Sequence, residues 1–122
     1  MVRLRRAQDG FTLIELLTVL VLLAVLVSIA VASFFGFRQR AQDRASQAVL
    51  REAVPSVHAY ASDHDGSFTG MTAALLRSQY DAGLNGFEVA SADDTSYCLR
   101  STLNERTWYG AGPPLVISQT AC

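Results

Sequence analysis

An unbroken apolar run near the start of the chain constrains its fold more than any other feature. From Leu16 to Phe37 there are 22 consecutive residues without a charge. An α-helix rises about 1.5 Å per residue, so roughly 20 such residues cross the hydrocarbon core of a bilayer. The alternative is a helix buried in a protein core, but a chain of 122 residues leaves almost nothing to surround it. The run therefore predicts a membrane-spanning helix.

Length and charge exclude several other classes of protein. A chain of 122 residues holds one small domain at most, which rules out two domains. Ten arginines and no lysine stand against eleven aspartates and glutamates, and the formal net charge is -1. Nucleic-acid binding domains usually carry a strongly basic face. DNA and RNA are therefore poor candidate partners.

The two cysteines indicate the compartment of the C-terminal part. Charge does not orient the apolar run, because three arginines lie on each side of it: Arg3, Arg5 and Arg6 before it, and Arg38, Arg40 and Arg44 after it. Cys98 and Cys122 lack the Cys-x-x-Cys or Cys/His spacing of a zinc site, so a disulfide is favoured. A disulfide requires an oxidising compartment. We expect the C-terminal part outside the cytoplasm.

Two processing schemes compete for the N-terminus. In the ordinary secretory scheme, cleavage after Ala30-Val31-Ala32 would release a chain that begins at Ser33. Against this scheme, Glu15 interrupts the start of the apolar stretch, and the run up to Ala32 is longer than the 7 to 15 apolar residues typical of the h-region of a signal peptide. A cut nearer the N-terminus is favoured.

A short motif at the start of the run supports that earlier cut. Gly10-Phe11-Thr12-Leu13-Ile14-Glu15, after a basic leader and before the apolar helix, resembles the processing motif of type IV prepilins and pseudopilins. In that family, a membrane-embedded prepilin peptidase cuts after the glycine on the cytoplasmic side and methylates the new terminal amine. The resemblance implies removal of residues 1–10, with Phe11 as the first mature residue.

Glu15 is an ionisable group at the N-terminal edge of the apolar helix. An ionised carboxylate inside a membrane is unfavourable by about 2.5 to 3.5 kcal/mol at full depth, so it needs a partner. Cleavage after Gly10 would expose an α-ammonium on Phe11, four residues away. The resemblance implies that Glu15 pairs with the terminal amine of a neighbouring subunit and sets the axial stagger. The alternative is an interfacial glutamate without a role.

A stripe of small side chains also follows this helix. Its members recur every four residues: Ala24, Ser28, Ala32 and Gly36. Such stripes allow helices to approach closely, but small residues are also frequent in any membrane helix, and both interpretations stay open. The chain departs from many pilins at one point, because no proline occurs between Phe11 and Val54.

Beyond Arg38 the helical pattern becomes one-sided. The apolar positions are three or four residues apart, as on one face of an amphipathic helix: Ala41, Ala45, Val49, Ala53, Val57 and Tyr60. We expect one continuous helix from about Phe11 to Ser62, with a bend at Pro55. Gly66 is the expected stop, since glycine adopts the left-handed conformation that closes helices.

The remaining residues predict a small sheet. A short helix is expected within Met71 to Tyr80, followed by strands that end at turns containing aspartate, asparagine or glycine. The expected strands are 87–92, 96–103 and 106–109, with a break at 110–114 and a fourth strand at 115–118. The fold class is α+β: a long N-terminal helix packed on a small antiparallel sheet, as in a pilin-like roll, with Phe87, Tyr97 and Trp108 in the core.

No cofactor, metal or catalytic site is predicted. The run Asp63-His64-Asp65 lacks the further oxygen ligands of a calcium-binding loop. His58 is expected to be a partly exposed helix residue. No nucleophile and base can be paired around either histidine, so an enzyme is not expected.

The sequence thus predicts a structural subunit of a type IV pilus or a related secretion or DNA-uptake pseudopilus. Its parts would be a leader (1–10), an apolar helix that spans the membrane and later forms the filament core (11–37), an amphipathic continuation (38–62) and a globular head (63–122). The implied partners are the cytoplasmic (inner) membrane, prepilin peptidase, the pilus assembly machinery, and copies of this chain or related pilins. The protein would move from that membrane to a cell-surface, extracellular or periplasmic filament. The competing class is a secreted or signal-anchored small binding domain that never polymerises.

Overall fold

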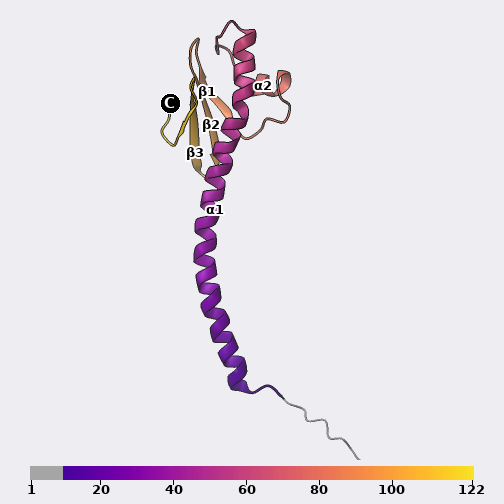
Figure 1. The fold of residues 1–122 in the computed structure, drawn as a ribbon, viewed down its shortest axis with the longest axis vertical. Helices are drawn as coiled ribbons and strands as arrows, with labels where there is room; N and C mark the ends of the chain where they lie inside the picture. The colour runs from indigo at the N-terminus through magenta and orange to yellow at the C-terminus, as the bar shows by residue number, and fades with distance from the viewer. Residues whose placement is uncertain (1–9) are drawn as a thin grey trace, which may run out of the picture. The chain divides into compact units, whose positions relative to one another are not determined.

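The computed structural model describes residues 10–122, in which two helices precede a four-stranded sheet (Figure 1). The predicted leader lies outside the described residues except for Gly10. The elements are α1 (Leu13–Asp63), α2 (Ala73–Gln79), β1 (Glu88–Ala92), β2 (Tyr97–Leu103), β3 (Arg106–Gly112) and β4 (Val116–Ser118). The α+β class and the element order agree with the sequence prediction.

The described chain divides into two compact units, with the boundary between Phe37 and Arg38, inside α1. In the first unit every residue from Gly10 to Phe37 is exposed. In the second unit one face of α1 is buried: Ser46, Leu50, Ala53, Ser56, Val57, Tyr60 and Ala61. The helix continues through Pro55. The bend expected at that proline stays a prediction.

The buried face of α1 begins at a different position from the predicted one. Ala41 and Ala45 are exposed, while Ser46 and Leu50 are 1% and 0% exposed. The predicted series advanced mainly in steps of four, which drift around a helix of 3.6 residues per turn. Steps that alternate between four and three residues stay on one face of the helix. The buried residues follow such steps from Ser46 through Leu50.

The end of α1 also differs by one position. The helix ends at Asp63, and the first residue with a left-handed backbone is Asp65 (φ 55°), followed by Gly66 (φ 87°). The Gly66 amide donates to the Ala61 carbonyl oxygen at 2.7 Å, which satisfies one of the last carbonyls of the helix. Aspartate tolerates this conformation better than most residues, so the closure begins before the glycine.

The sheet is an antiparallel meander in the order β1-β2-β3-β4. β2 and β3 pair without interruption from Tyr97↔Gly112 to Leu103↔Arg106. They are joined at Asn104 and Glu105, which both have positive φ (48° and 66°), as the two-residue hairpin turn that suits the strand twist requires.

β3 extends three residues further than predicted. The predicted break at Gly110 is wrong, because the two glycines serve close packing inside the strand. A Cβ on Gly110 would lie 3.1 Å from Leu115 Cδ1, and one on Gly112 would overlap the ring of Tyr97. Glycine in a strand often marks such an approach.

One core lies between the sheet, α2 and the second part of α1. Four leucines are fully or almost fully buried in it: Leu50, Leu76, Leu84 and Leu99. Of the three predicted aromatic core residues, Phe87 and Tyr97 are 5% and 2% exposed, whereas Trp108 is only half-buried at the margin. Its indole has a polar partner on α1, described below, which explains that position.

Candidate functional site

The first turn of α1 holds the predicted assembly residue, Glu15, in a capping box. The Thr12 amide and hydroxyl both donate to Glu15 Oε2 at 2.9 Å, and the Glu15 amide donates to Thr12 Oγ1 at 3.3 Å. Thr12 was not singled out from the sequence, although Thr-x-x-Glu before an apolar run is the signature of this cap. The reciprocal bonds hold the carboxylate at the positive end of the helix.

The predicted cleavage position lies just before this cap. α1 begins at Leu13, so the bond between Gly10 and Phe11 is outside the helix. Phe11 is 91% exposed, and among the described residues no atom other than those of Gly10 and its chain neighbours lies within 4 Å of the position that a Gly10 Cβ would take. The segment is open to an enzyme that must reach the backbone.

The first unit presents an apolar surface that nothing in the described chain covers. Its apolar stretch is fully exposed within the described chain, and the helix is, by length and composition, long and apolar enough to cross a membrane. Its hydroxyl groups bond internally: Thr18 Oγ1 donates to the Ile14 carbonyl oxygen at 2.6 Å, and Ser28 Oγ donates to that of Val25 at 2.7 Å. These bonds fit the helix to an apolar environment.

The small-residue stripe lies on this exposed surface. Ala24, Ser28, Ala32 and Gly36 all belong to the exposed stretch of α1, and a Cβ on Gly36 would have no neighbour within 4 Å. The stripe is therefore accessible to another helix. Nothing in the described part of the chain occupies it.

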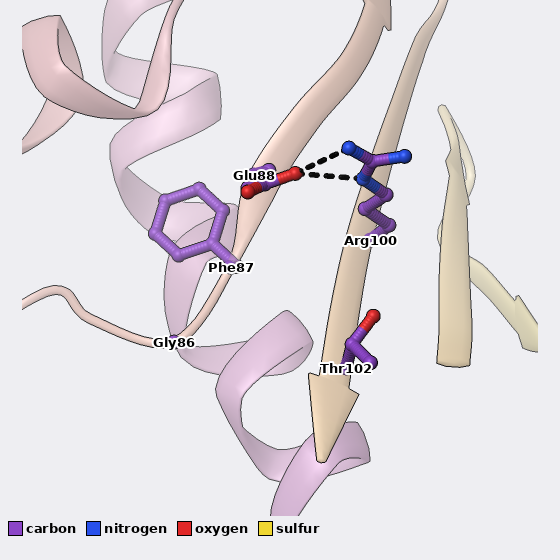
Figure 2. A pocket seen from close by; sticks show the side chains of 5 residues that line it. All are labelled: Gly86, Phe87, Glu88, Arg100 and Thr102. Carbon is purple, nitrogen blue, oxygen red and sulfur yellow. Dashed lines mark hydrogen bonds and ion pairs between the residues drawn. The ribbon is translucent and has the colours of Figure 1, made fainter. Parts of the chain in front are cut away.

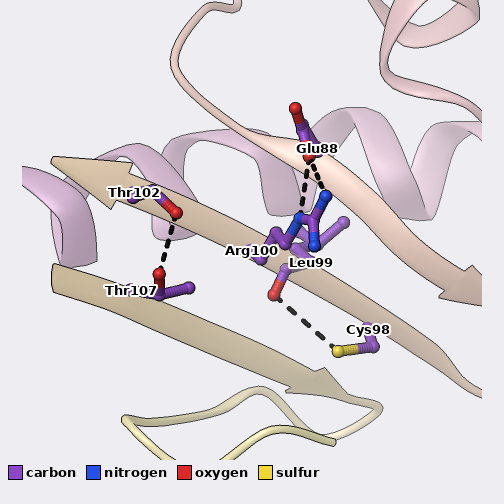
Figure 3. Close-up of polar contacts among 6 residues, drawn as sticks. All are labelled: Glu88, Cys98, Leu99, Arg100, Thr102 and Thr107. Carbon is purple, nitrogen blue, oxygen red and sulfur yellow. Dashed lines mark hydrogen bonds and ion pairs between the residues drawn. The ribbon is translucent and has the colours of Figure 1, made fainter. Parts of the chain in front are cut away.

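Part of the outer face of the sheet carries polar side chains that bond in pairs. A hollow of about 610 Å³ is lined by Gly86, Phe87, Glu88, Arg100 and Thr102 (Figure 2). Glu88 Oε2 accepts from Arg100 Nε at 2.7 Å and Nη2 at 2.6 Å, across the β1–β2 pair. Thr102 and Thr107 bond to each other at 2.9 Å between β2 and β3 (Figure 3). These four side chains thus bond in two pairs, each across neighbouring strands.

A disulfide joins Cys98 to Cys122, with a Cα–Cα distance of 6.0 Å. Cys98 lies on β2 and is 4% exposed (Figure 3). The bond ties the C-terminal residues to a central strand of the sheet and confirms the pairing that the sequence favours.

The side chains of the acidic run Asp63-His64-Asp65, at the end of α1, do not form a common site. Asp63 Oδ2 accepts from the Tyr80 hydroxyl at 2.8 Å, while His64 stacks on Tyr60 with ring centroids 3.9 Å apart. His64 Nδ1 lies 2.8 Å from the Tyr60 carbonyl oxygen. Within residues 10–122, no three His, Cys, Asp or Glu side chains converge on a possible metal position. His58 is exposed, as expected.

Asp43 is a structural residue that the sequence did not reveal. Its Oδ1 accepts from Trp108 Nε1 at 3.1 Å and from Arg106 Nε at 3.2 Å. Both donors are on β3, so Asp43 fastens the sheet to the second part of α1. A lone aspartate among arginines gives no sign of this role, because its partners are more than 60 residues away.

Sequence comparison relates the chain to known proteins. A family model described as the prokaryotic N-terminal methylation motif matches residues 5–31. The type IV wide pilus major component PilA4 of Thermus thermophilus is 33% identical over 122 residues, which cover 94% of this chain and 89% of that protein. The competence protein ComGC of Halalkalibacterium halodurans is 36% identical over 73 residues, covering 60% of this chain and 71% of its own length. No solved structure matches the chain significantly.

The described chain thus combines an apolar helical surface that it does not itself cover with a small disulfide-bonded α+β unit. The similarity to PilA4 extends over nearly the whole chain, and the methylation motif falls on the capped start of α1. The chain belongs to the type IV pilin family, and it is a structural subunit of the pilin or pseudopilin kind.

Proposed function

We propose that the chain is stored in the cytoplasmic membrane through residues 11–37, cleaved after Gly10, methylated at Phe11 and polymerised into a filament. The observation that carries this proposal is the first part of α1, whose apolar side chains are exposed throughout residues 11–37. In this scheme residues 1–10 are the leader, residues 38–62 continue the helix and residues 63–122 form the head. Exposed apolar side chains must be covered either by lipid or by other helices.

The proposed transfer from membrane to filament exchanges one apolar environment for another. Lipid tails and neighbouring helices are similarly apolar, so hydrophobic transfer does not by itself favour assembly. Close packing must then supply part of the driving force. Ala24, Ser28, Ala32 and Gly36 would allow such packing, because they keep one side of the helix narrow.

Glu15 is proposed to direct the register of assembly. Thr12 holds its carboxylate at the end of the helix, beside the residue that would carry the new ammonium group after cleavage. A free ammonium on Phe11 of one subunit and the Glu15 carboxylate of another would neutralise each other in an apolar surrounding. Loss of either partner there would be costly, because it would leave one uncompensated charge in an apolar surrounding.

The scheme defines the partners and the route of the protein. Prepilin peptidase would act on the Gly10–Phe11 bond at the cytoplasmic face of the membrane. The pilus assembly machinery would then move the subunit outward, to copies of itself or related pilins, in a surface, extracellular or periplasmic filament. The disulfide supports this route, since it requires an oxidising compartment for the head.

Removal of the Glu15 carboxylate tests the proposal. Glu15→Ala should leave the amount of protein in the membrane unchanged and lower the yield of sheared filaments about tenfold or more, the factor that 1.4 kcal/mol represents. Filament yield and membrane content are measured on the same cells with one antibody.

Glu52→Ala is the matched control, because it removes an exposed carboxylate from the same helix in the second unit. It should leave filament yield unchanged. Wild-type filament yield in Glu15→Ala would contradict the proposed role of Glu15.

A further inference from the structure

Charge is strongly separated along the second unit. Residues 38–51 contain four arginines and one aspartate, whereas residues 52–122 contain three arginines and eight carboxylates. The near-zero net charge of the whole chain conceals this separation. The first turns of α1 in this unit are basic, and the rest of the unit is acidic.

The basic end forms an uncompensated stripe. Arg40, Arg44 and Arg51 are spaced four and seven residues apart, so they share one face of α1, and all three are exposed. The ion pairs found within residues 10–122 involve other arginines, Arg100 and Arg106. Asp43, the one acid in these turns, is bonded to β3 instead. The arginine stripe thus has no counter-charge within the described residues.

The acidic end gathers carboxylates from two segments. Asp63 and Asp65 close α1, and the turn at Asp93 and Asp94 joins β1 to β2. The Phe68 amide donates to the Asp93 carbonyl oxygen at 3.1 Å, which ties that turn to the segment after α1. All four side chains are exposed, and the C-terminal end of a helix adds negative partial charge. We call this set the acidic end.

We propose that the arginine stripe of one subunit binds the acidic end of a second copy of this chain. The proposal rests on the proposed polymerisation. Arg40 and Asp63 are 23 residues apart on α1, about 35 Å at 1.5 Å per residue. The contact therefore joins two parallel copies that are offset along the helix by about this distance. A whole number of subunit steps in the filament must produce that offset.

A second copy is the occupant that accounts for both surfaces. One chain carries both signs of charge, so a polymer of parallel copies pairs every stripe with an acidic end. The stripe also begins three residues after Phe37, where the apolar surface proposed for helix packing stops. Anionic lipid headgroups would explain the arginines but would leave the acidic end without a partner.

These ion pairs select the partner and the offset more than they hold the filament together. Exposed pairs are individually weak and are screened by salt. Complementary patches nevertheless orient encounters and reject like-charged arrangements. Repetition along a filament multiplies a small preference at each contact.

A charge exchange in the full chain tests the proposal in producing cells. Arg40→Glu combined with Arg44→Glu should lower filament yield about tenfold, because it places like charges against the acidic end. Adding Asp93→Arg and Asp94→Arg should restore the yield to within about threefold of wild type. The hydrogen bonds of Asp93 use its backbone atoms, so the turn tolerates the exchange. Arg40→Lys with Arg44→Lys keeps the charge and is the matched control, expected to assemble normally.

The outcomes separate this proposal from its rival and from the proposed function. Normal filaments from the arginine-reversed variant overturn it while leaving polymerisation intact. A second outcome would be reduced filament yield that the aspartate exchanges do not restore, with the arginine-reversed variant binding phosphatidylglycerol vesicles more weakly than wild type does. That outcome assigns the stripe to lipid and also overturns the proposed contact between copies. Absence of filaments from the wild-type chain would contradict the proposed function itself, and this proposal with it. Loss and rescue by charge exchange support the contact between copies.

Discussion

Asp43 connects the helix to the sheet through a single carboxylate. It accepts from Trp108 and Arg106 while only 19% of its side chain is exposed. Removal of the carboxylate leaves the half-buried Trp108 Nε1 without its acceptor, whereas the Arg106 side chain, which is 43% exposed, stays hydrated. Asp43→Ala should therefore lower the free energy of unfolding of the second unit by about 1 to 3 kcal/mol.

Trp108 fluorescence reports this directly, because it is the only tryptophan of the chain. Denaturant titration of the full-length protein in detergent gives the free energy of unfolding. Arg44→Ala, one residue further along α1 and exposed, is the control and should change it little. Equal effects of the two substitutions would show that Asp43 does not fasten the sheet.

Tyr97 makes the stability sensitive to alkaline pH. Its ring is 2% exposed, its hydroxyl oxygen has no hydrogen-bond partner within the described chain, and burial raises its pKa above the ordinary value of 10.0. The folded state thus retains the phenolic proton to higher pH than the unfolded chain does. The free energy of unfolding should be unaffected below about pH 9 and fall as the pH rises through 10 toward the folded pKa.

Tyr97→Phe isolates this effect. The buried hydroxyl forms no bond within the described residues, so its removal should leave stability at pH 7 unchanged or raise it by up to about 1 kcal/mol. Tyr80, whose pKa is raised by desolvation and then by its bond to Asp63, remains in both proteins. The difference between the two curves therefore belongs to Tyr97. Parallel curves above pH 10 would contradict the assignment.

The C-terminal residues depend on the disulfide for their place beside β2. The bond closes a loop between positions 24 residues apart, for which chain entropy gives about 3 to 4 kcal/mol. Cys98→Ser combined with Cys122→Ser should lower the stability of the second unit by about this amount. Denaturant titration of wild type with and without reductant provides the comparison, and reductant should have no effect on the double variant. An unchanged wild-type midpoint in reductant would exclude a stabilising bond.

The sequence predicted the elements better than their edges. Apolar periodicity and turn residues located both helices and all four strands, because these signals are local. The extension of β3 through Gly110 and Gly112 was missed, because glycine alone indicates a break. Its role here depends on Leu115 and Tyr97, which contact these positions only in the folded sheet. The buried face of α1 was misplaced at its start for another reason, since steps of four residues drift around the helix and led to Ala41 and Ala45 in place of Ser46.

The polar contacts between distant segments were also beyond the sequence. Asp43 is among arginines in the chain, and only the fold brings it to β3. The cap formed by Thr12 and Glu15 is different, because its spacing is a local signature that could have been read. Local chemistry was therefore predictable at the start of α1, while long-range pairing was not.

The two units of the molecule differ in whether they bury their own apolar side chains. The second unit buries its own core, whereas the first unit has an apolar surface that it cannot cover. The apolar side chains of the first unit therefore need to be covered by lipid or by other helices. This requirement connects the proposed cleavage after Gly10, the proposed role of Glu15 and the proposed filament.

The N-terminus of the subunit in purified filaments tests that account most directly. Mass spectrometry of filaments sheared from producing cells should find a chain that begins with N-methylated Phe11 and retains the whole apolar helix. A chain that begins at Ser33, or one that retains Met1, would contradict it, as would filaments that do not contain this protein.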